Sequence, residues 1–246
     1  MRFVKVSLLV VSVMLAAQLA MADSIQAFNT RPVTVNGPAP GEVSLQDLLN
    51  QIYGCTGCVN AQTDQQSAGM WGLPGTSVMS PVLQFEYAGN ASSNVFGIWY
   101  TSDSSITPTM VPIFFGGATG QTMTFATIYW DAAGMHIFSP DASVNTGVFT
   151  GIPQSSFGFY LEGPGGTFYT VDQLNNGNPQ AIAYNYGSLD RWTFAFEDKP
   201  YANTDHDYND MVVSVESIAP VPEPASLCLL GSGLLGLGKI IRRKRS

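Results

Sequence analysis

Positive charge is scarce over most of this 246-residue chain. Between Asp23 and Pro220 the only basic residues are Arg31, Arg191 and Lys199, against 17 acidic residues, which leaves this stretch with a formal charge of −14. A protein that binds nucleic acid neutralises phosphates with lysine and arginine. The charge balance therefore excludes nucleic acid as a partner. Apolar residues make up 45% of the chain, so the acidic stretch should still fold around a core.

The chain also lacks an apolar run long enough to span a membrane comfortably, since a spanning helix needs about 20 residues. Its longest apolar runs lie at the two ends. At the start, Arg2 and Lys5 precede such a run, and the small residues Ala20 and Ala22 follow it. This order is typical of a secretory signal peptide, so we predict that signal peptidase removes residues 1–22. The alternative is an uncleaved anchor helix.

The other end, residues 220–246, has three parts in a fixed order. The segment Pro222-Glu223-Pro224 comes first, an apolar run follows, and the last part is basic, with Arg242, Arg243, Lys244 and Arg245. We expect a transmembrane helix at about 225–241 that holds the tail transiently in the inner membrane, with its cations in the cytoplasm.

This tripartite tail resembles the PEP-CTERM sorting signal of Gram-negative bacteria. The resemblance implies cleavage by a membrane-embedded exosortase, followed by release to the cell surface or the extracellular matrix. The alternative is an ordinary C-terminal anchor, which has the same topology but is not cleaved.

Cysteine is rare too, with three residues, of which Cys228 lies in the tail. Cys55 and Cys58 stand three positions apart, and no second pair exists to complete a zinc site with them. A thioredoxin-type motif would open a helix in a βαβ unit, whereas this pair follows a predicted helix. Because export favours oxidation, we predict a Cys55–Cys58 disulfide, with free thiols as the alternative.

The exported body begins with a polar, proline-containing stretch, residues 23–43, which we interpret as an extended lead-in. Residues 44–53 then combine a capping-box-like start at Ser44 with leucines at helical spacing, which predicts one short amphipathic helix. The body as a whole, residues 44–219, shows short alternating apolar runs punctuated by Gly, Pro, Asn and Ser, and no long helical pattern alternates with them.

This texture predicts an all-β fold, an antiparallel β-sandwich or jelly roll, with that single N-terminal helix. The predicted strands cover residues 82–88, 95–101, 111–115, 123–130, 135–139, 157–162, 180–185, 191–197 and 211–217. Within 191–197, Trp192, Phe194 and Phe196 should face the core together. We expect the aromatic residues to be mainly core; the alternative is an exposed platform that stacks on carbohydrate.

The segment that joins the last two predicted strands is rich in side-chain oxygens. Its six candidate ligands are Glu197, Asp198, Asp205, Asp207, Asn209 and Asp210. Two antiparallel strands bring both ends of their connecting loop together, so these side chains could surround one point. Calcium wants six to eight oxygen ligands, whereas zinc favours Cys and His and magnesium keeps more water. The sequence predicts a calcium site here; the alternative is a solvated acidic turn.

The same residues resemble domain-of-unknown-function family four-one-one-four. Phe196-Glu197-Asp198 and the later Asp205-x-Asp207-Tyr208-Asn209-Asp210 carry the likeness, which is strongest over 157–217. The loop between the two acidic halves departs from the glycine-rich loop of that family. The resemblance implies a β-rich, calcium-binding exported module found in bacterial surface proteins, and it implies no reaction.

No catalytic motif is present: the chain has no Gly-x-Ser-x-Gly, no Walker loop and no His-Glu-x-x-His, and only two histidines. We therefore expect a non-enzymatic surface or matrix protein, stabilised by calcium, whose partners are exopolysaccharide or other surface proteins. A second hypothesis is a carbohydrate-binding module that acts on exopolysaccharide. A third is a glycan-active enzyme, for which Glu86 and Glu162 are the carboxylates inside predicted strands.

Overall fold

The computed structural model describes residues 29–75, 78–101, 107–116, 124–187 and 190–221. They belong to one compact unit, Ala27–Val221. The predicted signal peptide, residues 1–22, and the predicted helix at 225–241 lie outside the described residues. Within the described part, no helix has the length and apolar character that a membrane span requires.

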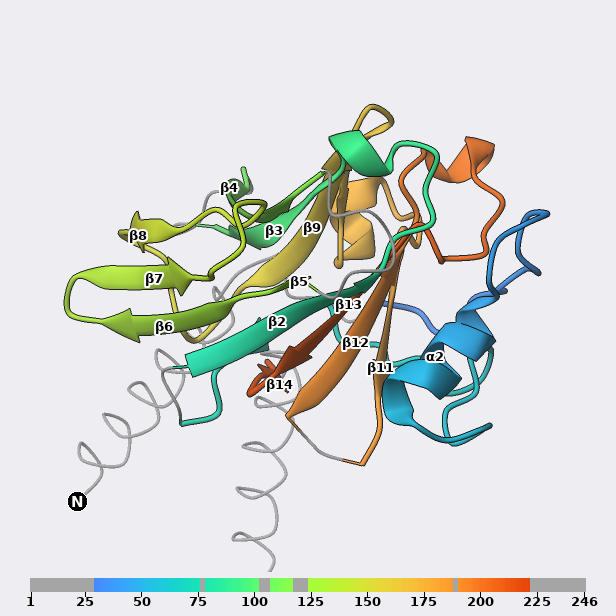
Figure 1. Cartoon of the computed structure of the whole chain (residues 1–246), viewed down its shortest axis with the longest axis horizontal. Coiled ribbons are helices and arrows are strands. Elements are labelled where there is room, and N and C mark those ends of the chain that lie inside the picture. Colours follow the sequence, from blue (N-terminus) through green and yellow to red (C-terminus); the bar gives the residue numbers. More distant parts are fainter. Residues whose placement is uncertain (1–28, 76–77, 102–106, 117–123, 188–189, 222–246) are drawn as a thin grey trace, which may run out of the picture. The chain divides into compact units, whose positions relative to one another are not determined.

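The described elements are mainly short strands (Figure 1). In chain order they are α2 (Leu45–Tyr53), β1 (Trp71–Gly72), β2 (Val78–Phe85), the 3₁₀ turn η1 (Ala91–Ser93), β3 (Val95–Tyr100), β4 (Thr109–Phe115), β5 (Thr124–Phe125), β6 (Thr127–Asp131), β7 (Gly134–Phe138), β8 (Gly147–Phe149), β9 (Gly158–Gly163), β10 (Gly166–Tyr169), η2 (Asp172–Asn175), β11 (Ala181–Asn185), β12 (Arg191–Phe196), η3 (Tyr201–Asn203), β13 (Met211–Glu216) and β14 (Ala219–Pro220).

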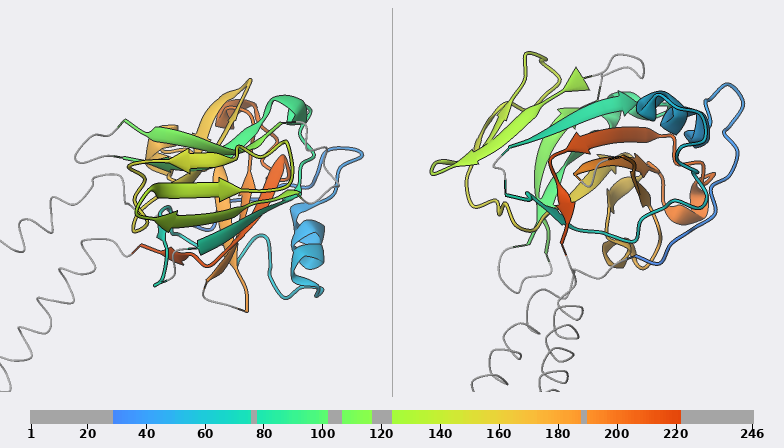
Figure 2. Two further views of the ribbon diagram at one scale, coloured as in Figure 1. Left: turned by 60° about the vertical axis from the view of Figure 1, so that its left-hand side comes forward. Right: turned by 90° about the horizontal axis from the view of Figure 1, so that it is seen from below.

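The strands form two large antiparallel sheets and one small one. The larger sheet has the order β11-β12-β13-β2-β6-β7-β8, with β5 also paired to β2, and the smaller has the order β10-β9-β3-β4. β1 and β14 pair as a two-stranded ribbon, so the segment just before β2 meets the end of the body. In Figure 2, α2 and the β6-β7-β8 strands lie toward opposite ends of the larger sheet.

The main core lies between the two large sheets. Phe96 of β3 and Phe159 of β9 stack with ring centroids 5.5 Å apart, and Phe159 also meets Phe194 of β12 at 4.7 Å. Trp192, Phe194 and Phe196 all belong to this cluster, as their alternation predicts. All four tryptophans are buried, which confirms that the aromatic residues mainly build the core. The predicted antiparallel sandwich with one short helix is confirmed.

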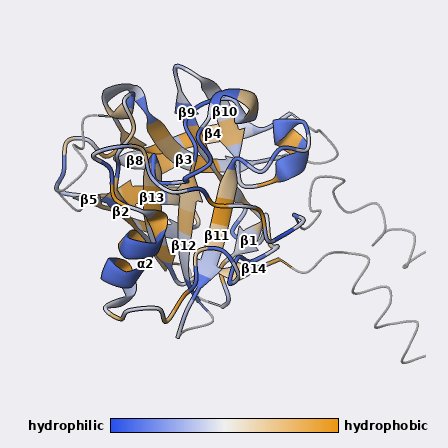
Figure 3. Ribbon diagram, turned by 90° about the vertical axis from the view of Figure 1, so that its right-hand side faces the viewer, coloured by the Kyte–Doolittle hydropathy of each residue, from blue (hydrophilic) through white to orange (hydrophobic). Residues whose placement is uncertain are grey.

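A second apolar cluster covers the outer face of the larger sheet. Leu45, Leu48 and Leu49 of α2 pack there against side chains of β11, β12 and β13. Figure 3 shows α2 beside this part of the larger sheet. The helix begins where the sequence predicts: the Ser44 hydroxyl accepts a hydrogen bond from the Asp47 amide at 3.2 Å. It ends at Gly54, whose φ of 66° is the left-handed conformation typical of a helix C-cap.

The lead-in is fastened along the body although it forms neither helix nor strand between residues 29 and 43. Arg31 makes a two-pronged ion pair with Asp172, at 2.7 and 2.9 Å, and its guanidinium also donates to the Ala181 carbonyl. Further along, the Asn36 amide donates to the His206 carbonyl. The lead-in therefore runs from the η2 turn to the loop between β12 and β13.

Some strand boundaries differ from the prediction. The strand predicted at 82–88 is β2, which begins four residues earlier at Val78. Within the predicted strand at 123–130, the described residues form two strands, β5 and β6, that break at Ala126. The break lies opposite Pro81 of β2, which has no N–H to donate to a partner strand. The short strands β1, β8, β10 and β14 were not predicted, because two to four residues carry too little periodicity.

Candidate metal centre

The loop that carries the candidate ligands leaves β12 after Phe196 and enters β13 at Met211, and these two residues pair across the strands. Because side chains alternate along a strand, consecutive residues at its end point to opposite faces. Glu197 contacts Tyr208, which belongs to the cluster under α2, while Asp198 contacts Asn94 beside β3. The sheet thus divides the acidic residues between its two faces.

On the outer face, Asp205 and Asp207 meet Glu42 of the lead-in. One carboxylate oxygen from each of the three residues lies within 4.8 Å of the other two. Among the described residues, this is the only group of three His, Cys, Asp or Glu side chains whose ligand atoms lie this close together. Asp205 is exposed, Glu42 is half-buried and Asp207 is 1% exposed. This outer site, Glu42, Asp205, Asp207 and the adjacent Asn209, is open to solvent on one side.

Asn209 completes the outer site through the orientation of its amide. Its Nδ2 donates to Glu42 Oε2 at 3.3 Å and to the Val43 carbonyl at 3.1 Å. Its Oδ1 is buried without a hydrogen-bond partner, as is Oδ2 of Asp207. Two buried acceptors without donors next to a carboxylate cluster are an arrangement that a cation would satisfy.

The backbone holds these side chains in place through two unusual residues. His206 and Tyr208 have positive φ values of 62° and 55°, which non-glycine residues adopt rarely. Tyr208 is fully buried, its amide donates to Glu197 Oε1 at 2.6 Å and its hydroxyl donates to the Pro179 carbonyl at 2.6 Å. Because His206 and Tyr208 both adopt left-handed backbone conformations, the chain turns sharply at residues 205–209, and the surrounding contacts stabilise this conformation.

Burial raises the pKa of the acidic side chains. Desolvation, followed by the charge of Asp210, raises the pKa of Glu197 to about 9, although the Tyr208 amide opposes the shift. Desolvation also raises the pKa of Asp207 to about 6 and that of Asp210 to about 7, with neighbouring carboxylates adding to both shifts. None of the ion pairs between described side chains involves these groups. Among the described residues, these acidic side chains therefore form no ion pair with a basic side chain.

The six predicted ligands therefore do not surround one point. Asp205, Asp207 and Asn209 gather on the outer face, where the structure adds Glu42. Asp198 lies toward the inside beside Asn94. Asp210 lies between the two groups, since its Oδ2 accepts from the Asp198 amide at 2.8 Å and its charge also raises the pKa of Glu197. Sequence reasoning missed Glu42, because it lies in the lead-in, 167 residues before its contact Asn209.

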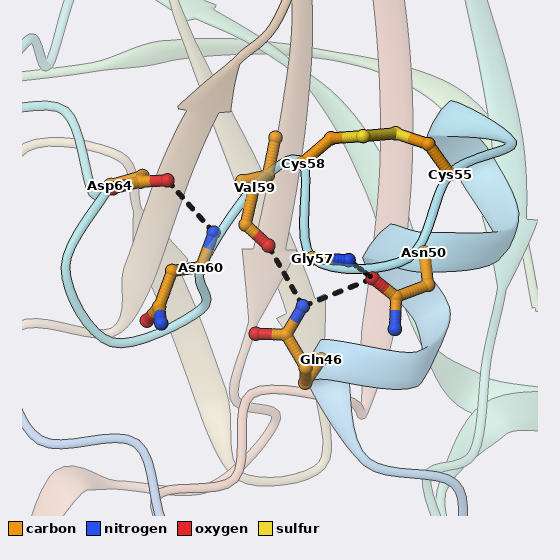
Figure 4. Close-up of a disulfide and its surroundings, with 8 residues drawn as sticks. All are labelled: Gln46, Asn50, Cys55, Gly57, Cys58, Val59, Asn60 and Asp64. Carbon is orange, nitrogen blue, oxygen red and sulfur yellow. Dashed lines mark hydrogen bonds between the residues drawn. A yellow bond between two sulfur atoms is a disulfide. The ribbon is translucent and has the colours of Figure 1, made fainter.

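Cys55 and Cys58 are joined by a disulfide just after α2 (Figure 4). Asn50 of the helix accepts from the Gly57 amide at 2.8 Å, and Gln46 donates to the Val59 carbonyl at 2.8 Å. The short loop is thereby fastened back onto the helix. The predicted processing residues lie outside the described residues: Ala20, Ala22, Pro222, Glu223, Pro224, Arg242, Arg243, Lys244 and Arg245.

Comparison with protein-family models gives two matches. Residues 136–218 match a domain of unknown function, DUF4114, and residues 220–245 match the PEP-CTERM protein-sorting motif. Part of the body is therefore similar to the DUF4114 domain, and the tail is similar to the PEP-CTERM sorting motif. The motif marks it as an exported protein of a Gram-negative bacterium that is anchored transiently in the membrane and processed by exosortase. No curated protein matches the chain.

The DUF4114 match begins within β7 and ends just after β13, so it is wider than the predicted 157–217. It contains all six predicted ligands. It does not contain Glu42, nor does it contain Glu86 and Asn94, which lie beside Asp198 and Asp210. The acidic groups on both faces of the module thus draw on residues upstream of it.

Proposed function

We propose that residues 23–221 form a calcium-stabilised, non-enzymatic module that is displayed at the cell surface or released into the extracellular matrix. The observation that carries this proposal is the outer site, where Glu42, Asp205 and Asp207 bring carboxylate oxygens within 4.8 Å of one another. The unpartnered oxygens of Asp207 and Asn209 add two further acceptors. Signal peptidase and exosortase are the processing enzymes in this proposal.

The donor set favours calcium over other divalent cations. All four side chains offer hard oxygen donors, which calcium prefers, and water can supply the remaining ligands on the exposed side. Zinc would favour Cys and His, and His206 is the one such residue close by, with its ring packed against Tyr201 at 4.3 Å. Magnesium demands near-ideal octahedral geometry, which donors from a lead-in and a loop are less suited to impose.

Calcium at the outer site would tie the lead-in to the module. With a dissociation constant of ~0.1 mM and ~1 mM calcium outside the cell, binding adds about 1.4 kcal/mol to the free energy of unfolding. That is a useful fraction of the 5–15 kcal/mol, roughly, by which a domain is stable. The protein would reach full stability only after export into a calcium-containing medium.

The test compares thermal unfolding of residues 23–221 in chelator and in ~5 mM calcium, a saturating dose at this affinity. We expect calcium to raise the melting temperature, and the substitutions Glu42→Gln and Asp207→Asn each to reduce the increase. Glu162→Gln, which changes an exposed carboxylate of β9, is the matched control and should respond as the unaltered protein does. An identical melting temperature with and without calcium would refute the proposal.

The non-enzymatic part of the proposal rests on the carboxylates that sequence analysis singled out. Glu86 is buried, with 4% of its surface exposed, whereas Glu162 is exposed. A glycosidase needs two carboxyl groups that flank one substrate. These two side chains differ too much in access to solvent to support that role. Turnover of a panel of glycans by the purified protein would overturn this part.

A second candidate function, carbohydrate binding, has one observation in its favour. On the outer face of the β6-β7-β8 strands, the rings of Tyr129 and His136 stack with centroids 4.4 Å apart and planes 6° apart. Phe138 on the same face is 65% exposed. Flat, exposed rings of this kind can stack on sugars. In this alternative, exopolysaccharide is the ligand. In the calcium-stabilised scaffold proposed first, the partners are other surface proteins.

A glycan array tests the carbohydrate alternative. Binding that is lost with Tyr129→Ala and kept with Phe115→Ala, which alters an exposed aromatic residue of β4, would support it. Equal binding by the two variants, or no binding by the unaltered protein, would leave the calcium-stabilised scaffold as the function.

A further inference from the structure

A second group of oxygen-bearing side chains lies where four strand ends converge. Glu86 follows β2, Asn94 precedes β3, Asp198 follows β12 and Asp210 precedes β13. The antiparallel pairing of β12, β13 and β2 brings three of these ends together, and the short η1 turn connects β2 to β3. We call this group the inner site.

Direct contacts connect its members. Asn94 Nδ2 donates to Asp198 Oδ2 at 3.2 Å, and the Asp198 amide donates to Asp210 Oδ2 at 2.8 Å. The Tyr87 amide, next to Glu86, donates to the Asp210 carbonyl at 3.2 Å. The charges of Asp198 and Asp210 also add to the desolvation that raises the pKa of Glu86 to about 8, which the Asn94 amide opposes. The four side chains thus share one environment.

The turn between β9 and β10 covers this group closely. A Cβ atom added to Gly163 would lie 2.4 Å from Asn94 Oδ1, and one added to Gly165 would lie 2.4 Å from the Asp198 carbonyl oxygen. Such distances leave no space for a side chain, so glycine lets the backbone approach Asn94 and Asp198 directly. The exposed fraction is accordingly 0% for Asn94 and Asp198 and 4% for Glu86.

Several of these buried atoms are acceptors without donors. Both carboxylate oxygens of Glu86, Oδ1 of Asn94 and Oδ1 of Asp198 are buried and have no hydrogen-bond partner. Leaving one such group unsatisfied costs about 1–3 kcal/mol, so a native fold rarely tolerates four of them side by side. Like charges also repel one another. The oxygens of the three inner carboxylates accordingly lie farther apart than those of the outer site, which come within 4.8 Å of one another.

We propose that the inner site binds a divalent cation, with calcium as the ion that its donors fit, through Glu86, Asn94 and Asp198, while Asp210 lies beside them and accepts from the Asp198 amide. A calcium ion takes six to eight oxygens, and the carboxylate of Glu86, Asn94 Oδ1 and Asp198 Oδ1 offer buried acceptors for it, with the amide nitrogen of Asn94 as the donor nearest to Glu86. The ion would balance two of the three carboxylate charges. This proposal uses none of the outer-site residues, so it stands or fails separately from the proposed function.

The test counts the calcium ions bound per chain by equilibrium dialysis of residues 23–221. We expect two ions for the unaltered protein, one for Glu42→Gln combined with Asp205→Asn, and one for Glu86→Gln. Glu162→Gln should keep both. If Glu86→Gln binds as many ions as the unaltered protein, the inner site is overturned. If the Glu42→Gln and Asp205→Asn double variant binds as many ions as the unaltered protein while Glu86→Gln binds fewer, only the outer site is overturned.

Melting temperatures separate cation binding from a carboxyl group that simply holds a proton. Glu86→Gln removes a buried charge but keeps the size of the side chain, so it should raise the melting temperature in chelator and lower it in calcium, relative to the unaltered protein. Asn94→Ala, which removes a ligand and no charge, should lower the melting temperature in calcium and halve the ion count. If Glu86→Gln instead stabilises the protein equally in both conditions, the site holds protons and the proposal is wrong.

Discussion

The ion pair between Arg31 and Asp172 offers a sharp test of how the lead-in is held. The side chain of Arg31 is 1% exposed and that of Asp172 is 16% exposed, and the two meet through two parallel hydrogen bonds of 2.7 and 2.9 Å. Arg31 also donates to the Ala181 carbonyl at 2.7 Å. Replacing Arg31 by methionine would leave a partly buried carboxylate and a backbone carbonyl without their donor.

Breaking a fully buried pair costs about 3–5 kcal/mol, and the partial access of water to Asp172 reduces this to about 2–3 kcal/mol. For a domain of this size, that loss lowers the melting temperature by about 4–12 °C. Urea unfolding followed by tryptophan fluorescence measures the loss directly. The matched control is Arg191→Met, because Arg191 meets Glu216 at 3.5 Å with side chains 37% and 56% exposed. That substitution should cost about 0–1 kcal/mol.

A double-mutant cycle with Asp172→Asn decides whether the two side chains act as a pair. We expect a coupling free energy of about 1.5 kcal/mol or more, within the usual range for residues in contact. If Arg31→Met costs no more than Arg191→Met, or if the two substitutions are additive, the lead-in is held by its other contacts and our reasoning about this ion pair is refuted.

Three further predictions concern other parts of the body. Gly97→Ala should lower the free energy of unfolding in urea by at least about 2 kcal/mol, because the added Cβ would lie 2.3 Å from the Val111 carbonyl oxygen and 2.6 Å from the Tyr160 ring. Gly89→Ala, whose added Cβ would have no atom within 4 Å, is the control, and equal losses for the two variants would contradict this reason. In chelator, the melting temperature should fall as the pH rises from about 5 to about 9. Glu197 and Glu86 have folded pKa values of about 9 and 8, well above their unfolded values. The stability that these protonated groups give at low pH is therefore lost as each gives up its proton. Saturating calcium should flatten this profile, and an unchanged slope would count against both cation sites. Replacing Cys55 and Cys58 together by serine should cost no more than about 2 kcal/mol, because the closed loop is so short, and a larger loss would show that the disulfide does more than restrict the unfolded chain.

The sequence predicted the elements that carry long, regular patterns. Alternation places Trp192, Phe194 and Phe196 in the main core, and the leucine spacing after Ser44 predicts α2 and its start. Both patterns are local, since each can be detected within about ten residues of sequence.

The site was predicted only in part, because its members come from distant segments. Asp205 and Asp207 could be found from their spacing, but Glu42 is brought to them by the path of the lead-in. Glu86 approaches Asp210 through the pairing of β2 with β13, and Asn94 reaches Asp198 from the other sheet, just after the η1 turn. The division into two faces follows from strand alternation, which continues past the end of β12 to Glu197 and Asp198. A cue was present, since Glu86 stands in a predicted strand where a buried carboxylate is unusual.

The contact between Asn209 and Glu42 joins residues that are 167 positions apart in the chain. Closing a loop of that length costs about 4.5 kcal/mol in chain entropy before any contact compensates for it, so the contact forms late in folding. If the predicted signal peptide directs export with the N-terminus first, the lead-in would leave the cytoplasm well before the loop does. In such N-terminus-first export, the outer site would assemble only when nearly the whole body has crossed the membrane, and it would then mark completed translocation.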